Sequence, residues 1–276
     1  MSKLTCEICP HHCRLEPGQV GLCRARANVD GQVQAINYGL ITSAALDPIE
    51  KKPLYHFHPG SMILSLGSFG CNLRCQFCQN WEISTAGKDD ANWGRLLPEE
   101  AVELALQLQN RGNIGIAYTY NEPLVGYEFV FDCAELARAQ GLKNVLVSNG
   151  CFCREPLERI LPLIDAVNFD LKAFSEQFYR RIGGDLETVK AAIALAAERT
   201  HVEVTTLVIP GENDSEAEIK ALAQWLAGIG RDIPLHLTRF FPRYKYNDRF
   251  PTDVQRLRKL AEIAREDLEH VYLGNC

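Results

Sequence analysis

The chain has 276 residues, a formal net charge of -6, 46% hydrophobic residues and 23% charged residues. This composition excludes a disordered chain, and the absence of a Lys/Arg stripe with interleaved aromatic residues gives no electrostatic basis for binding nucleic acid. No run of about 18 apolar residues occurs and the start MSKLTCEICPHHC lacks the apolar core of a signal peptide, so we expect no membrane association and a cytoplasmic location.

The first 30 residues or so carry cysteines at metal-ligand spacing. These are Cys6, Cys9, Cys13 and Cys23. In a reducing compartment clustered thiols favour metal binding over disulfides, and so short a segment needs a metal to fold. Four thiolates suit structural zinc or an auxiliary iron–sulfur cluster, and His11 or His12 could replace one of them. We expect residues 1–58 to form a cysteine-rich lobe with its connector and residues 59–276 the main domain.

A second set of cysteines follows the first predicted strand of the main domain, "SMILSLGSFG" (61–70). The loop "GCNLRCQFCQN" contains Cys71, Cys75 and Cys78. A structural zinc site has four ligands, whereas a cubane cluster on three thiolates keeps one iron open for a reactive ligand. The alternatives are a zinc site with a distant fourth ligand, or three cysteines packed as small apolar residues.

From there strands and helices alternate along the chain. Hydrophobic periodicity and capping residues predict helices over 97–112, 127–141, 155–164, 186–199, 215–229 and 252–266. Apolar runs predict strands over 61–70, 114–120, 143–150, 166–172, 202–211, 233–239 and 270–274. This alternation indicates a parallel sheet covered by helices, either open or closed into a barrel.

Polar residues end several of these strands, where parallel α/β folds bind their ligands. They are Asn121, Glu122, Ser148, Asn149, Asp170, Lys172, Asn213, Asp214, His236 and Arg239. Each has a simpler interpretation as well: Glu122 as a helix-start acid, Asp170 with Lys172 as an ion pair, and His236 as a core histidine with satisfied hydrogen bonds. Their common placement predicts a single cleft.

The pattern Cys-x3-Cys-x2-Cys after the first strand, with Phe77 before the third cysteine, resembles the radical S-adenosylmethionine (SAM) superfamily. The segments "DPIEKKPLYHFHPGS", "TYNEP", "SNG", "NFDLKAF", "PGENDS" and "VYLGN", in this order, resemble the AmmeMemoRadiSam system radical SAM enzymes, which are related to pyruvate formate-lyase-activating enzymes. The resemblance extends from Cys6 to Asn275. It implies an α/β fold, a partial (β/α)6-type TIM barrel with a small N-terminal cysteine-rich lobe.

The resemblance also implies a [4Fe-4S] cluster on Cys71, Cys75 and Cys78, with SAM chelating the open iron. Further cofactor-binding residues are implied: Glu122 for the SAM amino group with Asn121 in place of a glycine, Ser148 and Asn149 near the ribose, Asp170 and Lys172 near the SAM carboxylate, His236 near the nucleoside, and Phe77. Val147 stands where the activating enzymes have an aspartate, which makes a cation site there doubtful.

The implied function is reductive cleavage of SAM to a 5'-deoxyadenosyl radical, which abstracts hydrogen from an unidentified substrate. A flavodoxin or ferredoxin would donate the electron, and Memo-like and AMMECR1-like proteins are implied as partners. A glycyl-radical-enzyme-activating protein and a non-catalytic metal-binding or electron-transfer module are the alternatives. The sequence leaves open the metal at the N-terminal cysteines, the oligomeric state and the roles of Cys151, Cys153 and Cys276.

Overall fold

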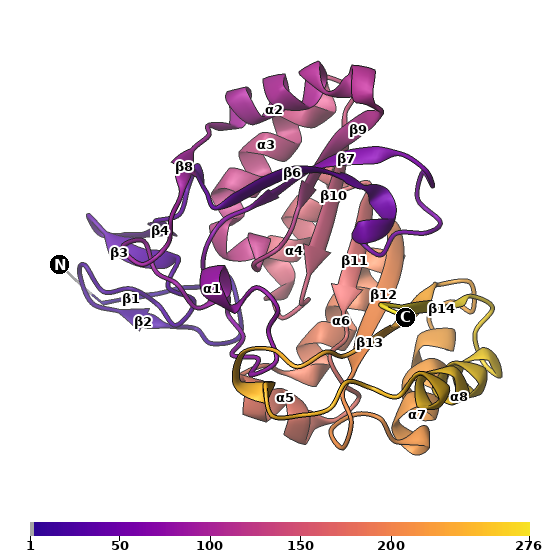
Figure 1. Cartoon of the computed structure of the whole chain (residues 1–276). Helices are drawn as coiled ribbons and strands as arrows, with labels where there is room; N and C mark the ends of the chain where they lie inside the picture. The colour runs from indigo at the N-terminus through magenta and orange to yellow at the C-terminus, as the bar shows by residue number, and fades with distance from the viewer. Residues whose placement is uncertain (1–2) are drawn as a thin grey trace.

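A computed structural model describes residues 3–276, and in this part of the chain one curved sheet of eight strands organises the fold. Seven strands run parallel and coincide with the seven predicted ones. In spatial order they are β7 (Met62–Gly67), β9 (Asn113–Tyr118), β10 (Lys143–Ser148), β11 (Ala166–Asp170), β12 (His201–Val208), β13 (Leu235–Arg239) and β14 (Val271–Gly274). The sheet curves into the predicted partial barrel, with β14 at its far edge (Figure 1).

Helices connect successive parallel strands and cover the outer face of the sheet (Figure 1). They are α2 (Pro98–Gln107), α3 (Tyr127–Ala139), α4 (Arg154–Ile160), α5 (Glu176–Ile182), α6 (Leu186–Ala197), α7 (Glu216–Ala227) and α8 (Val254–Arg265). Short 3-10 turns also occur, namely η2 (Gln109–Arg111), η3 (Pro123–Gly126), η4 (Leu161–Leu163) and η5 (Tyr244–Tyr246). The sequence predicted these helices except α5, which begins at Ser175 with the serine hydroxyl accepting a hydrogen bond from the Phe178 amide.

The N-terminal lobe consists of hairpins at one side of the barrel (Figure 1). The strands β1 (Leu4–Thr5) and β2 (Arg14–Leu15) form one hairpin, and β3 (Arg26–Val29) and β4 (Gln32–Ala35) form the other. Arg26 is 4% exposed and pairs with Glu128 on α3 over 2.7 Å. This ion pair, buried on the arginine side and partly exposed on the glutamate side, attaches the lobe to the barrel.

The eighth strand of the sheet, β6 (Ser43–Pro48), runs antiparallel to β7 at the first edge. A second small pairing joins β5 (Leu40–Ile41) to β8 (Gly94–Arg95), and the short helix α1 (Trp81–Ser84) follows the cysteine loop. The sequence did not predict β6. β6 lies within residues 1–58, which the sequence analysis assigned to the lobe and its connector, and yet it pairs with β7 of the main sheet. The domain boundary at residue 58 stays a prediction.

Residues 49–58, which we call the floor segment, lie against the inner face of the barrel. The segment starts with η1 (Ile49–Lys51) and buries Ile49 and Leu54 completely. These side chains form a small apolar cluster with Ile63, Ala117, Val145 and Ala166, of which Ile63, Val145 and Ala166 lie in the first half of their strands and Ala117 is in register with Val145. The floor segment therefore closes the N-terminal end of the barrel and leaves the other end for a ligand.

Within residues 3–276 no helix has both the length and the apolar character needed to cross a lipid bilayer.

Candidate active site

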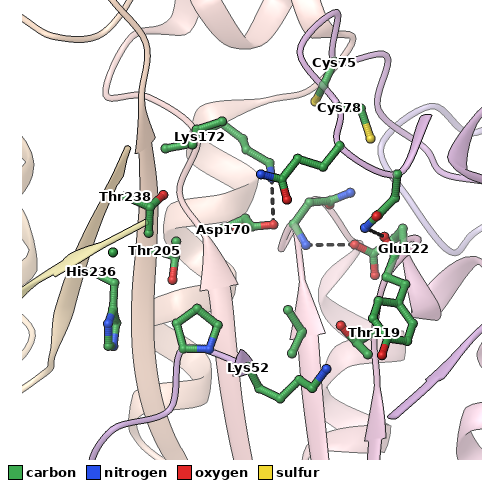
Figure 2. A pocket seen from close by; sticks show the side chains of 18 of the residues that line it. Lys52, Cys75, Cys78, Thr119, Glu122, Asp170, Lys172, Thr205, His236 and Thr238 are labelled. Carbon is green, nitrogen blue, oxygen red and sulfur yellow. Dashed lines mark hydrogen bonds and ion pairs between the residues drawn. The ribbon is translucent and has the colours of Figure 1, made fainter. Parts of the chain in front are cut away.

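The three cysteines that follow β7 border one cavity of about 540 Å³ at the C-terminal ends of the strands. This volume lies within the usual range for small-molecule sites. Phe77 is also part of the wall and packs against Phe178, with ring centroids 5.9 Å apart. Figure 2 shows Cys75 and Cys78 at one end of the cavity, above Lys172 and Asp170.

Two neighbours hold the start of the cysteine loop. The Cys71 amide donates to the Cys23 carbonyl oxygen over 3.2 Å, so the N-terminal lobe contacts the loop directly. Gly70 adopts a φ of 88°, and a Cβ there would lie 2.4 Å from the same carbonyl oxygen. The Asn121 side-chain amide donates to the carbonyls of Phe69 (3.2 Å) and Gly70 (3.0 Å). Asn121 thus borders the predicted site and also fixes the cysteine loop.

Glu122 supplies a buried carboxylate at the end of β9. It is 2% exposed and accepts hydrogen bonds from the Ser148 hydroxyl (3.0 Å), the Asn149 amide (2.8 Å) and the Leu124 amide (3.1 Å). Burial raises the pKa of Glu122 to about 7, although these hydrogen bonds lower it. The carboxyl group therefore changes its charge near neutral pH.

Asn149 connects this carboxylate to the cysteine loop. Its side-chain amide lies 3.7 Å from the Cys71 sulfur and donates to the Asn72 side-chain oxygen over 2.8 Å. Asn149 borders the cavity, whereas Ser148 lies behind it and contacts Glu122. Of the two residues predicted at the end of β10, Asn149 thus lines the cavity and Ser148 supports Glu122 from behind.

Asp170 and Lys172 form an ion pair of 2.7 Å inside the cavity (Figure 2). Burial alone would lower the pKa of Lys172, but the negative charges of Asp170 and of an ionised Cys75 together outweigh burial and raise it. The main chain of Lys172 is held by the Tyr179 hydroxyl and by the Asn213 side chain. A fixed ammonium therefore faces the cysteine end of the cavity.

The environment of the thiols suits a metal cluster. Burial raises the pKa of Cys71 well above its ordinary value and that of Cys75 to about 12, so thiolates need a nearby cation here. Among residues 3–276 no three His, Cys, Asp or Glu side chains converge as ligands of a single metal ion. A cubane attaches each cysteine to a different iron, so these residues fit a cluster better than a zinc ion.

The remaining strand-end residues differ in position. His236 borders the cavity, but its Nε2 lies 2.6 Å from the Glu203 carboxylate, as expected of a core histidine with a satisfied hydrogen bond. Asp214 binds the main chain of its own loop, Asn213 binds its own loop and the Lys172 carbonyl, and Arg239 donates to the Thr252 carbonyl. These last three side chains lie outside the cavity, where their polar groups hold loop main chain.

The four N-terminal cysteines border a separate small cavity together with His11. Burial raises the pKa of Cys9 to about 12, and the three other thiols are close enough to add to this shift. His11 lies 2.8 Å from the Asn72 carbonyl oxygen, while His12 pairs with Glu7 on the surface. The two histidines therefore have other partners, and the cysteines alone are grouped.

Cys151 and Cys153 connect the turn after β10 to its surroundings. The Cys151 carbonyl accepts a hydrogen bond from the Asn72 side chain (2.7 Å), and the Cys153 amide donates to the Ile8 carbonyl (3.0 Å). Neither thiol borders the 540 Å³ cavity, and Cys276 is exposed at the chain end. These main-chain contacts tie the turn to the cysteine loop and the N-terminal lobe.

Sequence reasoning missed four polar residues in or behind the cavity wall. Lys52 and Tyr120 border the cavity, and Asp47 and Glu203 lie behind it and bind residues of its wall. Lys52 lies in the segment "DPIEKKPLYHFHPG", where two adjacent lysines look like a solvated pair. A buried position for the second lysine could have been suspected from the apolar residues that follow it, Pro53 and Leu54.

A partial α/β barrel with a cysteine loop and charged strand ends around one cavity defines an α/β-barrel protein with a candidate metal-cluster site. The family model of the radical SAM superfamily matches residues 66–223, more than half of the chain. The chain therefore belongs to the radical SAM superfamily, and it is an enzyme.

Similar proteins agree with this assignment. An uncharacterized protein of Methanocaldococcus jannaschii is 41% identical over 278 residues, which cover 99% of this chain and 82% of that protein. The pyruvate formate-lyase-activating enzyme of Clostridium pasteurianum is 26% identical over 219 residues, 72% of this chain and 89% of that enzyme. The crystal structure of QueE from Escherichia coli superposes with a TM-score of 0.54 at 16% identity, over 87% of this chain and 94% of QueE, and shows the shared fold.

Proposed function

We propose that Cys71, Cys75 and Cys78 bind a [4Fe-4S] cluster and that the enzyme cleaves SAM reductively. The observation that supports this proposal is that three thiols, the Glu122 carboxylate and the Lys172 ammonium line the same cavity. When bound, the cluster supplies the electron that breaks a carbon–sulfur bond of SAM and leaves a 5'-deoxyadenosyl radical, which abstracts a hydrogen atom from the substrate.

The chain's own residues bind and orient SAM in this proposal. Glu122 accepts from the SAM amino group, and Lys172, held by Asp170, binds the SAM carboxylate. Asn149 and His236 face the ribose and the nucleoside. Around these contacts, Ser148 supports Glu122, Asn121 fixes the cysteine loop and Phe77 supplies an apolar wall that excludes water.

The test compares Cys75→Ala with Cys133→Ala after anaerobic reconstitution with iron and sulfide. Cys133 is a buried cysteine of α3 outside the cavity, so it controls for the loss of a thiol. The proposal predicts about four fewer irons per chain and no 5'-deoxyadenosine with dithionite for Cys75→Ala, and normal values for Cys133→Ala. Deoxyadenosine formation by Cys75→Ala would contradict it.

The N-terminal cysteines, in our proposal, bind a metal centre that stabilises the lobe. The support is that all four border one cavity in a segment too short for a core of its own. A single zinc ion requires all four sulfur atoms to move within coordination distance of one point, whereas an iron–sulfur cluster binds cysteines that lie farther apart. One zinc per chain identifies a structural site, and about eight irons per chain identify an auxiliary cluster.

The enzyme needs an electron donor, for which we propose a flavodoxin or ferredoxin of the cytoplasm.

The motif "DPIEKKPLYHFHPGS" supports membership of the AmmeMemoRadiSam group, with Memo-like and AMMECR1-like proteins as partners. The likeness to a pyruvate formate-lyase-activating enzyme favours a second candidate, activation of a glycyl radical enzyme. Co-purification of the tagged chain with either class of partner distinguishes them. The non-catalytic alternative is rejected by the family assignment.

A further inference from the structure

The floor segment is fixed to strands on both sides of the barrel interior. The Glu203 carboxylate, fully buried on β12, accepts hydrogen bonds from the amides of Tyr55 (3.0 Å) and His56 (2.8 Å). The Asn168 side chain on β11 donates to the Pro53 carbonyl (2.9 Å), and His56 is bonded to the Tyr272 hydroxyl of β14 (2.6 Å). The segment therefore spans the barrel from its first edge to its last strand.

Lys52 of this segment is a buried cation on the wall of the large cavity. Its side chain is 3% exposed, and its ammonium donates to Asp47 over 2.9 Å. Among the described residues this is its one hydrogen-bond partner, and the Tyr120 ring lies 4.7 Å away. An ammonium has three N–H donors, so Lys52 retains donors for a ligand.

Lys52 shares its counter-ion with two other donors. Asp47 accepts hydrogen bonds from Lys51 (3.2 Å), Lys52 and the Tyr120 hydroxyl (2.6 Å), so two ammonium groups share one carboxylate. Glu50 also borders the cavity, and its carboxylate accepts from the Gly60 amide within its own loop, so Lys51, Lys52, Asp47 and Glu50 together carry no net charge. An anion next to Lys52 is therefore bound by direct charge-assisted hydrogen bonds to the ammonium.

Tyr120 is built into this arrangement. Its backbone has a φ of 72°, which is uncommon for a residue with a side chain. Gly67 provides the space for its ring, since a Cβ at Gly67 would lie 2.8 Å from Tyr120. Because a strained residue needs support from its surroundings, the position of the Tyr120 hydroxyl on Asp47 is a fixed feature of the wall.

The Lys52 end of the cavity lies opposite the cysteines. Figure 2 shows Lys52 at one end, Cys75 and Cys78 at the other, and Asp170 and Thr205 between them. Asp170 and Lys172, proposed above to bind SAM, lie toward the cysteine end, whereas His236 lies closer to the Lys52 end (Figure 2) and packs against Tyr55. The Lys52 ammonium and the Tyr120 hydroxyl are polar groups that the proposed SAM contacts do not use.

From these observations we infer that the Lys52 end binds the anionic group of a small organic substrate, a carboxylate or a phosphate ester, and directs the rest of that substrate toward SAM. This inference rests on the proposed function and names its substrate class. Lys52 is the binding residue, and Asp47 and Tyr120 position it. The floor segment encloses the substrate, as a small molecule requires and a protein loop does not.

The test is equilibrium dialysis of the reconstituted, SAM-saturated enzyme without reductant. The probe is a defined mixture of small carboxylic acids and phosphate esters with their neutral amide and alcohol analogues, quantified by mass spectrometry. We expect the wild-type enzyme to retain at least one anion over its neutral analogue and Lys52→Met to bind that anion at least about tenfold more weakly. Lys143→Met removes an ammonium paired with Asp165 outside the cavity and should bind the anion like the wild type.

Several results separate folding from binding. Asp47→Asn with Lys52→Met removes both charges, so it leaves no unpaired buried carboxylate and is expected to bind SAM normally without retaining the anion. Preference for neutral compounds, retention of no anion, or equal retention by Lys52→Met would overturn the inference. Deoxyadenosine formation after dithionite is added to a separate portion of each preparation reports on the proposed function, because it needs no substrate anion.

Discussion

The amide of Cys71 donates a hydrogen bond to the carbonyl of Cys23, so a cysteine of the N-terminal lobe is bonded to the first cysteine of the triad. A second contact follows at the next residue, where His11 lies 2.8 Å from the Asn72 carbonyl oxygen. The lobe and the cysteine loop are therefore one structural unit, although 48 positions (71 − 23) separate the two cysteines in the sequence.

Gly70→Ala should separate this unit. The new Cβ would need a φ of 88° and would lie 2.4 Å from the Cys23 carbonyl, so we expect a loss of about 3 kcal/mol or more in the free energy of unfolding. Gly141→Ala is the matched control, because Gly141 has a φ of 73° and open space. It should lose about 1 kcal/mol. Equal losses in urea unfolding would show that the close approach is unimportant.

Cys9→Ser should remove the metal of the N-terminal lobe and loosen the cysteine loop. The buried hydroxyl is a poorer metal ligand than a thiolate, so we expect the lobe to become sensitive to thermolysin and the triad to load less iron. Cys276→Ser changes an exposed cysteine and should behave like the wild type. The measurements are metal content and the rate of proteolysis. An unchanged metal content in Cys9→Ser would exclude a metal site in the lobe.

SAM binding should weaken as the pH falls below 7. The pKa of Glu122 is about 7 because burial opposes its charge, so the carboxylate that accepts from the SAM amino group is present above pH 7 and lost below it. We expect the dissociation constant of SAM to rise up to about tenfold per pH unit below that point. Glu122→Gln should bind SAM weakly with a flatter pH profile, and an equally steep profile in this variant would assign the titration to another group.

Glu203→Gln should destabilise the barrel. Burial opposes the charge of Glu203, but hydrogen bonds from His201, His236 and two floor amides outweigh it and lower the pKa to about 2. The carboxylate thus stabilises the fold at neutral pH, and that contribution is lost as the pH falls from about 4.5 to about 2. Replacement should cost about 3 kcal/mol in the free energy of unfolding. Glu262→Gln, an exposed change on α8, should cost almost nothing, and denaturant unfolding of both variants provides the comparison.

The sequence was sufficient to predict what depends on local pattern. Seven apolar runs gave seven parallel strands, and the position of Glu122 after such a run placed its carboxylate at the cavity. Strand-end position did not distinguish Glu122 from Asn213, since an asparagine that closes its own loop has the same sequence signature as one that binds a ligand. Only the three-dimensional contacts show that Glu122 borders the cavity and that Asn213 does not.

The floor segment could not be predicted for a different reason. The stretch "DPIEKKPLYHFHPG" has neither helical nor alternating periodicity, and its conformation is set by partners far along the chain. The His56 amide binds a residue 147 positions later, and the His56 ring binds one 216 positions later. The burial of Lys52 follows from these distant contacts.

These separations also set an order of events during synthesis. The floor segment leaves the ribosome before any parallel strand of the barrel, but Glu203 and Tyr272, which hold it, are among the later residues to appear. Contacts between such distant positions form slowly, because the intervening chain must first be ordered. The barrel interior therefore remains accessible until β14 is made, and the cavity that we propose for SAM and its substrate is the last part of the molecule to close.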